Sequence, residues 1–320
     1  MRILSGSIGW AIAGALGLAA AGAAAEPVPE KLVMFTDWYA QADQGGFYEA
    51  LAGDFYARHG LAVEIRAGAP RMPIFPLVAR NRAPLAISNS DDVITAISEG
   101  FPVVMIMAYF ERSPIGVMYD AAHPVHSFRE LDGRTVMAQP ASAWVRFVEK
   151  KYRIKINVVP NTWGIGRFLA DPSRTFLQQG YVTNEPYLVA QAGRVAGMLP
   201  LFDADYRPYR VVYANRDFAR AHPAEIRAFV AASLEGWQEY LHGDHAQADA
   251  LMKSRNPETN DAILAFSRGA ITQYHLVEGL PAAGEAPGRL DPERLRQAVA
   301  TMSELGVIRS APAVAGLVFP

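Results

Sequence analysis

Apolar residues along the chain occur in short runs that alternate with segments of helical periodicity. A strand-length run at 31–35 precedes a segment in which Phe47, Leu51 and Phe55 recur every fourth position, the spacing of one helix face. In residues 61–65, Leu, Val and Ile then alternate with other residues, as in a half-buried strand. This order predicts an α/β lobe with parallel strands and right-handed crossovers.

The same pattern continues through two thirds of the chain. Further strands are expected at 84–88, 102–108, 115–119, 134–138, 156–159, 180–183, 198–202 and 209–213. Further helices are expected near 73–80, 89–99, 142–152, 162–169 and 185–192. The run at 209–213 is expected to return the chain to the first lobe. The chain therefore reads as two α/β lobes.

From Pro223 onward the pattern is helical, in three or four segments. Asn256 precedes Pro257 and Asp291 precedes Pro292, so each pair places a capping residue before a proline suited to the first helical position. Both pairs are therefore expected to begin helices.

The first 25 residues differ from the rest. Arg2 gives a short basic start, an alanine-rich apolar stretch follows, and small residues at Ala23 and Ala25 precede Glu26. This layout is typical of a secretory signal peptide cleaved after Ala25. A retained membrane anchor is the alternative, because about 20 apolar residues can span a bilayer. We expect a soluble, exported mature chain.

Composition narrows the function. Hydrophobic residues at 51% exclude intrinsic disorder, and a formal charge of −2 argues against nucleic-acid binding. Zero cysteines exclude disulfides, thiolate nucleophiles, Cys-ligated zinc and iron–sulfur clusters. Nucleophile-elbow, zincin and Walker motifs are also missing from the sequence. We therefore expect a binding protein rather than an enzyme, with no metal and no cofactor.

Several spaced motifs carry a family resemblance, which covers about 31–241. They are 37–38 (Asp-Trp), 45–50 (Gly-Gly-Phe-Tyr-Glu-Ala), 55–65, 88–92 (Ser-Asn-Ser-Asp-Asp), 131–134 (Leu-Asp-Gly-Arg) and 179–186 (Gln-Gly-Tyr-Val-Thr-Asn-Glu-Pro). Together they resemble ABC-importer solute-binding proteins related to the thiamine-pyrimidine synthases. The sulfonate, taurine and nitrate binding proteins are more distant relatives. The resemblance implies the type II periplasmic-binding-protein fold: two doubly wound α/β lobes, a two-crossover hinge and a ligand cleft.

This fold divides the chain into a signal peptide and three further segments. The expected divisions are 1–25 (signal peptide), 26–111 (first part of lobe 1), 112–203 (lobe 2) and 204–320 (second, mostly helical part of lobe 1). The resemblance also implies a periplasmic location. The implied partners are a small-molecule ligand and the transmembrane subunits of an ABC permease, with the protein itself a monomer.

Departures from the family restrict the activity. Eukaryotic pyrimidine synthases carry a histidine where this chain has Gln44, together with a cysteine-rich cluster that is missing here. The self-consuming synthase activity is therefore disfavoured. The resulting hypothesis is capture of a small planar nitrogenous compound, similar to a thiamine-pyrimidine precursor. The alternatives are a receptor for sulfonate, taurine or nitrate anions and an exported pyrimidine-metabolising enzyme.

Candidate ligand-binding residues follow from the fold, because loops at the carboxyl ends of parallel strands face the crevice. Trp38 and Trp163 are expected to close over one flat ring from opposite sides, unless they are core residues. Glu185 offers two acceptor oxygens that match the paired N–H donors of an aminopyrimidine, or it caps its own helix.

The remaining candidates are polar or aromatic residues in the same loops. Asn89 and Ser90 either hydrogen-bond a ligand or cap the following helix, and Gln44 either binds or is an exposed helix residue. The complete predicted ligand-binding set is Asp37, Trp38, Gln44, Asn89, Ser90, Tyr109, Trp163, Asn184 and Glu185.

Overall fold

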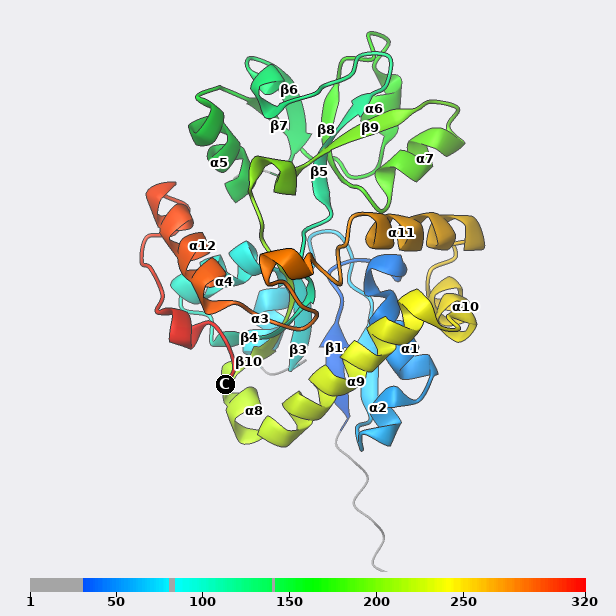
Figure 1. Ribbon diagram of the computed structural model, residues 1–320, viewed down its shortest axis with the longest axis vertical. Coiled ribbons are helices and arrows are strands. Elements are labelled where there is room, and N and C mark those ends of the chain that lie inside the picture. The colour runs from blue at the N-terminus through cyan, green and yellow to red at the C-terminus, as the bar shows by residue number, and fades with distance from the viewer. Residues whose placement is uncertain (1–30, 81–83, 140–141) are drawn as a thin grey trace, which may run out of the picture.

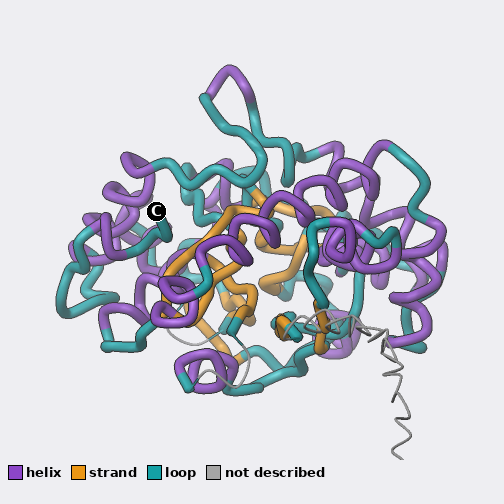
Figure 2. The backbone as a smooth tube through the Cα atoms, turned by 90° about the horizontal axis from the view of Figure 1, so that it is seen from below, coloured by secondary structure: helices purple, strands orange, loops and turns teal. Residues whose placement is uncertain are grey.

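Two five-stranded sheets organise the protein into two stacked lobes. The structure is a computed structural model that describes residues 31–80, 84–139 and 142–320, so the predicted signal peptide lies outside the described residues. Figure 1 shows one lobe above the other, with the chain passing between them in the middle of the molecule. Seen from below, helices surround the strands of the lower lobe (Figure 2).

The first sheet contains both the first and the last strand of the described residues. Its strands are β1 (Leu32–Phe35), β2 (Val63–Arg66), β3 (Leu85–Asn89), β4 (Val103–Phe110) and β10 (Arg210–Asn215), in the order β2-β1-β3-β10-β4. β1 pairs in parallel with β2 and β3, as predicted. β10 is antiparallel to β3 and β4, because it returns from the second lobe at the edge where those strands end. The expectation of a purely parallel lobe is therefore wrong at β10.

The second sheet is mixed for the same reason. Its strands are β5 (Ile115–Asp120), β6 (Thr135–Ala138), β7 (Asn157–Pro160), β8 (Leu177–Tyr181) and β9 (Ala196–Pro200), in the order β7-β6-β8-β5-β9. β5 enters from the first lobe and is antiparallel to β8 and β9. The sheets are joined by residues 111–114 and 201–209. The domain boundaries at 111/112 and 203/204 stay a prediction.

Two strand positions differ from the expectation. β8 begins at Leu177 rather than at 180, because Gln178 and Gln179 conceal the strand in a hydrophobicity pattern although Gln178 is buried. β9 spans Ala196–Pro200, two residues before the expected run. Burial within a sheet does not require an apolar residue, and the amide nitrogen of Gln178 donates to the Gly164 carbonyl oxygen at 3.0 Å.

Helices cover both sheets. Those of the first lobe are α1 (Gly45–Ala52), α2 (Phe55–Arg58), α3 (Ile74–Ala79), α4 (Ser90–Ser98), α8 (Arg216–Ala221), α9 (Pro223–His242), α10 (Ala246–Arg255), α11 (Asp261–Gln273) and α12 (Pro292–Glu304). Those of the second lobe are α5 (Ala143–Tyr152), α6 (Gly166–Ala170) and α7 (Glu185–Gln191). Short 3₁₀ turns are η1 (Ala42–Gln44), η2 (Phe128–Leu131), η3 (Leu201–Ala204), η4 (Pro281–Ala283) and η5 (Val314–Gly316).

Glycines allow α1 to pack closely on α9, the long helix that crosses the lower lobe in Figure 1. A Cβ atom at Gly46 would lie 2.2 Å from the Trp237 ring, and one at Gly236 would lie 2.3 Å from the Gly46 carbonyl oxygen. A side chain at either position would push the helices apart, because the Trp237 ring and the α1 backbone are close-packed and cannot move away. This contact holds the loop before α1 in place.

The two predicted helix starts near prolines have different outcomes. Asp291 accepts a hydrogen bond from the Glu293 N–H at 2.8 Å, and Pro292 is the first residue of α12, as predicted. Asn256 instead ends α10, and the next helix begins at Asp261 behind Asn260. The Asn256 amide group donates to the Ala40 carbonyl oxygen at 3.0 Å, so a long-range contact overrides the local capping pattern.

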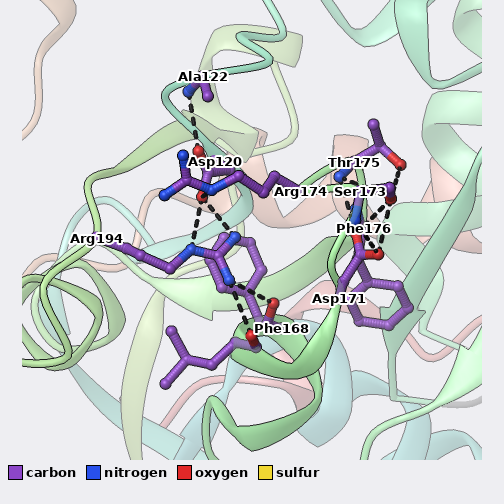
Figure 3. A network of polar contacts seen from close by, with 10 residues as sticks. Asp120, Ala122, Phe168, Asp171, Ser173, Arg174, Thr175, Phe176 and Arg194 are labelled. Atoms are coloured by element: carbon purple, nitrogen blue, oxygen red, sulfur yellow. Dashed lines mark hydrogen bonds and ion pairs between the residues drawn. The ribbon is translucent and has the colours of Figure 1, made fainter.

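A buried polar network fixes the outer part of the second lobe (Figure 3). Asp120 accepts hydrogen bonds from Arg194 Nε at 2.8 Å and from the Ala122 N–H at 2.9 Å. Arg194 also donates to the carbonyl oxygens of Phe168 and Leu169 near the end of α6. The end of α6 is thereby tied to β5. Among the described residues, none of the helices is both long and apolar enough to cross a bilayer.

Candidate ligand-binding site

A buried arginine gathers three strand ends of the first sheet. Arg210, the first residue of β10, is only 2% exposed. It donates from Nη2 to Asp37 Oδ2 at 2.6 Å, from Nε to the Tyr109 hydroxyl at 2.8 Å and from Nη1 to Asn89 Oδ1 at 3.2 Å. Three of the predicted site residues therefore meet at one guanidinium group.

The loop that carries Asp37 is held by its neighbour Thr36. Thr36 Oγ1 donates to the Trp38 carbonyl oxygen at 2.6 Å and accepts from the Gly68 N–H at 3.1 Å. A Cβ atom at Gly68 would lie 2.2 Å from the Thr36 carbonyl oxygen, so only glycine permits this approach. The direction of the Asp37 carboxylate is therefore determined by the backbone on both sides.

Arg210 keeps its charge although it is buried. Burial alone would lower the pKa of Arg210, but the Asp37 carboxylate and the Tyr109 and Tyr181 hydroxyls raise it above its ordinary value. The guanidinium carbon lies 6.0 Å from the centre of the Tyr181 ring on β8. Arg210 thus belongs to the first lobe and faces an aromatic ring of the second.

Asp43 connects the lobes directly. Its Oδ2 accepts from Thr183 Oγ1 at 3.1 Å, beyond the end of β8, and from Gln41 Nε2 at 3.0 Å. Its buried Oδ1 has no hydrogen-bond partner among the described residues. Burial raises the pKa of Asp43 to about 6. This carboxyl group retains acceptor capacity at the contact between the lobes.

Glu185 is held over the end of β8. Its Oε2 accepts from the Tyr181 N–H at 2.6 Å, and a Cβ atom at Gly180 would lie 3.1 Å from the Glu185 carboxyl carbon. Burial, with a smaller contribution from the nearby Asp43 carboxyl group, raises the pKa of Glu185 to about 7. The side chain thus anchors its own loop, and its role toward a ligand stays a prediction.

The two predicted aromatic clamps contact each other. The Trp38 and Trp163 ring centres lie 5.2 Å apart with an angle of 41° between the ring planes. Trp163 is 37% exposed and has a φ of +63°, a left-handed conformation that is rare for a bulky residue. A flat ring between them would need a separation of about 7 Å, two van der Waals layers. The expected sandwich is therefore not the arrangement in this structure.

Three further candidates form hydrogen bonds within the protein. Gln44 is buried, unlike the exposed alternative, and its Oε1 accepts from the Gln41 N–H at 3.1 Å. Ser90 Oγ accepts from the Tyr209 N–H at 3.0 Å, and Asn184 is the residue that precedes α7. Their contribution to ligand binding stays a prediction.

Sequence reasoning missed Arg210, Asp43 and Tyr181 as neighbours of the predicted set. Arg210 had a usable signal, because it interrupts the apolar run at 209–213 and a buried charge requires partners. Asp43 had none, since an acid before Gly45 is typical of an exposed loop. Within residues 31–80, 84–139 and 142–320, no cluster of three or more His, Asp or Glu side chains is suited to a metal ion.

Comparison with known proteins adds family and fold. The family model described as NMT1/THI5 like matches residues 41–246. The formylaminopyrimidine-binding protein of Halalkalibacterium halodurans is 37% identical over 110 residues, which are 33% of this chain and 32% of that protein. The match therefore spans about a third of the relative's length.

Solved structures share the architecture of both lobes. The periplasmic aliphatic sulphonate binding protein SsuA from Escherichia coli superposes with a TM-score of 0.68 at 14% identity, covering 91% of this chain and 92% of SsuA. The desulfurization enzyme DSZB superposes with a TM-score of 0.57 at 11% identity, covering 90% of this chain and 96% of DSZB. These likenesses confirm the type II periplasmic-binding-protein fold, which serves binding proteins and at least one enzyme.

Proposed function

This chain belongs to the NMT1/THI5-like family, and we propose on that basis that it is the solute-binding component of an ABC importer. It captures a small planar nitrogenous compound, similar to a thiamine-pyrimidine precursor, in the periplasm and delivers it to a permease. The partial match to a formylaminopyrimidine-binding protein supports this ligand class.

The observation that carries the proposal is an excess of hydrogen-bond acceptors where the lobes meet. Asp37, Asp43 and Glu185 contribute carboxyl groups, whereas Arg210 already donates to Asp37, Tyr109 and Asn89. A ligand rich in N–H donors complements such a site, because each amino group supplies two donors.

Two buried oxygens strengthen this argument. Among the described residues, Asp43 Oδ1 and Gln178 Oε1 have no hydrogen-bond partner. The Gln178 amide nitrogen donates to the Gly164 carbonyl oxygen at 3.0 Å, next to Trp163, so its oxygen is left to accept. Buried acceptors without partners cost free energy that a donor-bearing ligand recovers.

The same groups disfavour the anion alternative. A sulfonate or nitrate requires donors, yet the guanidinium of Arg210 is paired with Asp37 and lies near further carboxyl groups. The enzyme alternative loses support from the missing cysteines and from Gln44, although the fold also accommodates an enzyme.

Closure of the two lobes is the proposed mechanism of capture. Asp43 contacts Thr183, Trp38 contacts Trp163 and Arg210 faces Tyr181, so the described interface already joins the lobes. A ligand that touches both sides adds contacts available only to the closed state and shifts the equilibrium toward it.

A thermal-shift screen of the purified mature chain tests the proposal. We expect aminopyrimidines to raise the melting temperature, because a ligand at 100 times its Kd stabilises the folded state by about 2.7 kcal/mol. Taurine, nitrate and an alkanesulfonate serve as comparison ligands. Stabilisation by these anions alone would reject the proposed ligand class. Mass spectrometry of the recovered aminopyrimidine should show it unchanged, and a new product would indicate an enzyme.

A further inference from the structure

A cavity lies beside the hinge and borders the Arg210 cluster through Ser90 and Tyr209, the chain neighbours of Asn89 and Arg210. It has a volume of about 510 Å³ and is bounded by the two stretches that join the sheets, the first turn of α4, α5, the loop after η4 and α12. Figure 1 shows α5 and α12 on the same side of the molecule, one in each lobe. This volume suits a small organic molecule. Of the predicted importer-ligand residues Ser90 lines it, whereas Asp37, Trp38, Asn89 and Tyr109 do not, and neither does Arg210.

Glu111 is the unusual residue of this cavity. It follows β4 at the first crossing between the lobes, lines the cavity and is only 1% exposed. Its Oε1 has no hydrogen-bond partner among the described residues. A buried carboxyl oxygen without a partner is costly, so the fold keeps an acceptor here at the expense of stability.

The nearest cation is committed to other groups. Arg294 of α12 donates from Nε and Nη2 to the Arg207 carbonyl oxygen at 3.1 and 2.8 Å, and it also donates to the Glu111 carbonyl oxygen. Its guanidinium carbon lies 3.6 Å from the centre of the Tyr209 ring. Arg294 Nη1 is 3.4 Å from Glu285 but 3.6 Å from Glu111 Oε2, too far for a hydrogen bond. Arg294 therefore braces both crossings without satisfying the Glu111 carboxyl group.

The charge of the lining favours a cation. Three arginines line the cavity, Arg207, Arg289 and Arg294. The carboxyl groups that line it are Asp91, Glu111, Asp205, Glu285, Asp291 and Glu293. With Glu111 protonated, five carboxyl groups still line the cavity beside three arginines.

We propose that this cavity is a binding site for a small organic ammonium compound, with the ammonium group at Glu111 Oε1 and the apolar part against Phe147, Tyr206 and Met302. An ammonium group is a compact donor of three hydrogen bonds and matches a single carboxyl oxygen. Aromatic and thioether walls suit its alkyl part. Ser90 is the one predicted importer-ligand residue in the lining of this cavity, so the proposed ammonium site goes beyond the importer ligand.

Occupancy of this site is coupled to lobe movement. Phe147 belongs to α5 of the second lobe, Met302 belongs to α12 of the first, and Tyr206 lies in the connecting stretch. Across the same face, Lys150 Nζ lies 3.0 Å from Glu304 Oε2 and Arg146 donates to the Gly306 carbonyl oxygen at 3.0 Å. A bound molecule would bridge these elements and change the balance between open and closed forms.

Binding should release a proton. Burial raises the pKa of Glu111 to about 8, with Arg294 and Arg289 opposing and Glu285 and Asp291 assisting that rise. Near neutral pH the carboxyl group is therefore largely protonated, and an ammonium group that binds its anionic form displaces that proton to the buffer. The affinity should rise between about pH 6 and pH 8.

The test is calorimetry with n-butylammonium chloride at pH 7 in two buffers of different ionisation enthalpy, with sodium chloride as the ionic control. We expect binding and proton release in the wild type, and affinity at least about tenfold weaker with no proton release in Glu111→Gln. Glu293→Gln, an exposed acid at the rim, should bind within about twofold of the wild type. Equal affinity in Glu111→Gln, or no binding by the wild type, would overturn the proposal.

A second variant and a local probe keep the result specific to this cavity. Ala298 lines the cavity on α12, so Ala298→Leu should block butylammonium while Glu111 is retained. The methyl resonance of Met302 in carbon-13-labelled protein should shift on binding in the wild type and in neither blocking variant. A butylammonium response that leaves Met302 unmoved would assign the binding to another acidic site and reject this one.

Discussion

Two buried aspartates, Asp120 and Asp43, differ in their hydrogen-bond partners and in the direction of their pKa shifts. Asp120 accepts from a backbone N–H and from a guanidinium group in the second lobe, and although burial opposes it, these contacts lower the pKa of Asp120 below its ordinary value. Asp43 lies where the lobes meet, receives only neutral donors and keeps one oxygen without a partner among the described residues. Its pKa is raised instead.

The difference separates a structural acid from an acid available for binding. A fully paired buried carboxylate stabilises one conformation, whereas an incompletely paired one is stabilised further only by a proton or by a ligand. The same contrast applies to Arg210 and Glu111, since each nitrogen of the guanidinium group donates a hydrogen bond, whereas one oxygen of the carboxyl group has no partner among the described residues. The unpartnered oxygens of Asp43 and Glu111 therefore mark two places where this protein is expected to bind.

The largest expected effect comes from breaking the satisfied network. Asp120→Ala leaves the mostly buried Arg194 without its counterion and should lower the free energy of unfolding by about 3–5 kcal/mol. Urea unfolding followed by circular dichroism measures this loss. A change below about 1 kcal/mol would mean that the network contributes no more than a surface ion pair.

The second effect is the pH dependence of the unliganded protein at Asp43. Its folded-state pKa of about 6 exceeds the ordinary value of 3.8, so the folded form holds the proton more tightly than the unfolded form. This contribution is fully present below about pH 4 and is lost as pH rises through about 6, a change of about 3 kcal/mol.

Asp43→Asn should remove that dependence. Urea unfolding from pH 4 to pH 7.5 measures the difference in unfolding free energy between the wild type and Asp43→Asn. The wild type should lose stability relative to Asp43→Asn as pH rises. The exposed acid Asp54, whose left-handed backbone suits asparagine, provides the control Asp54→Asn. If that difference in unfolding free energy does not change with pH, the pKa of Asp43 is not raised by burial at the contact between the lobes.

The third effect concerns ligand affinity at Glu185. Replacing its carboxyl group by an amide in Glu185→Gln should weaken an aminopyrimidine by about 1–3 kcal/mol, because charge-assisted hydrogen bonds are lost. Calorimetry measures the change, with the exposed Glu258→Gln as the matched control. Unchanged affinity would leave Glu185 with only its bond to the Tyr181 N–H.

The smallest effect is expected at the aromatic pair. Trp38→Ala should reduce affinity for planar ligands by about 1 kcal/mol through lost ring contacts, with a smaller relative change in the melting temperature of the free protein. Trp38→Phe should recover part of the affinity. If Trp38→Ala destabilises the free protein as much as it weakens ligand binding, Trp38 acts as a packing residue against Trp163.

Local patterns in the sequence determined most of the element order and the family. Apolar periodicity located β1, β2 and α1, and the Asp291-Pro292 pair located the start of α12, because each depends on neighbours within one or two turns. The spaced motifs from 37 to 186 were sufficient to predict the fold class. The sulphonate-binding protein SsuA has this fold at 14% identity, so few shared residues accompany it.

The tertiary structure alone decided which side chains meet. Arg210 contacts Asn89 across 121 positions and Asp37 across 173, so no local period could pair them. The antiparallel direction of β10, the direct Trp38–Trp163 contact and the unpartnered oxygens of Asp43 and Glu111 have the same origin. Chain order and hydrophobic spacing specify which segments form, whereas burial and charge pairing are properties of segments brought together.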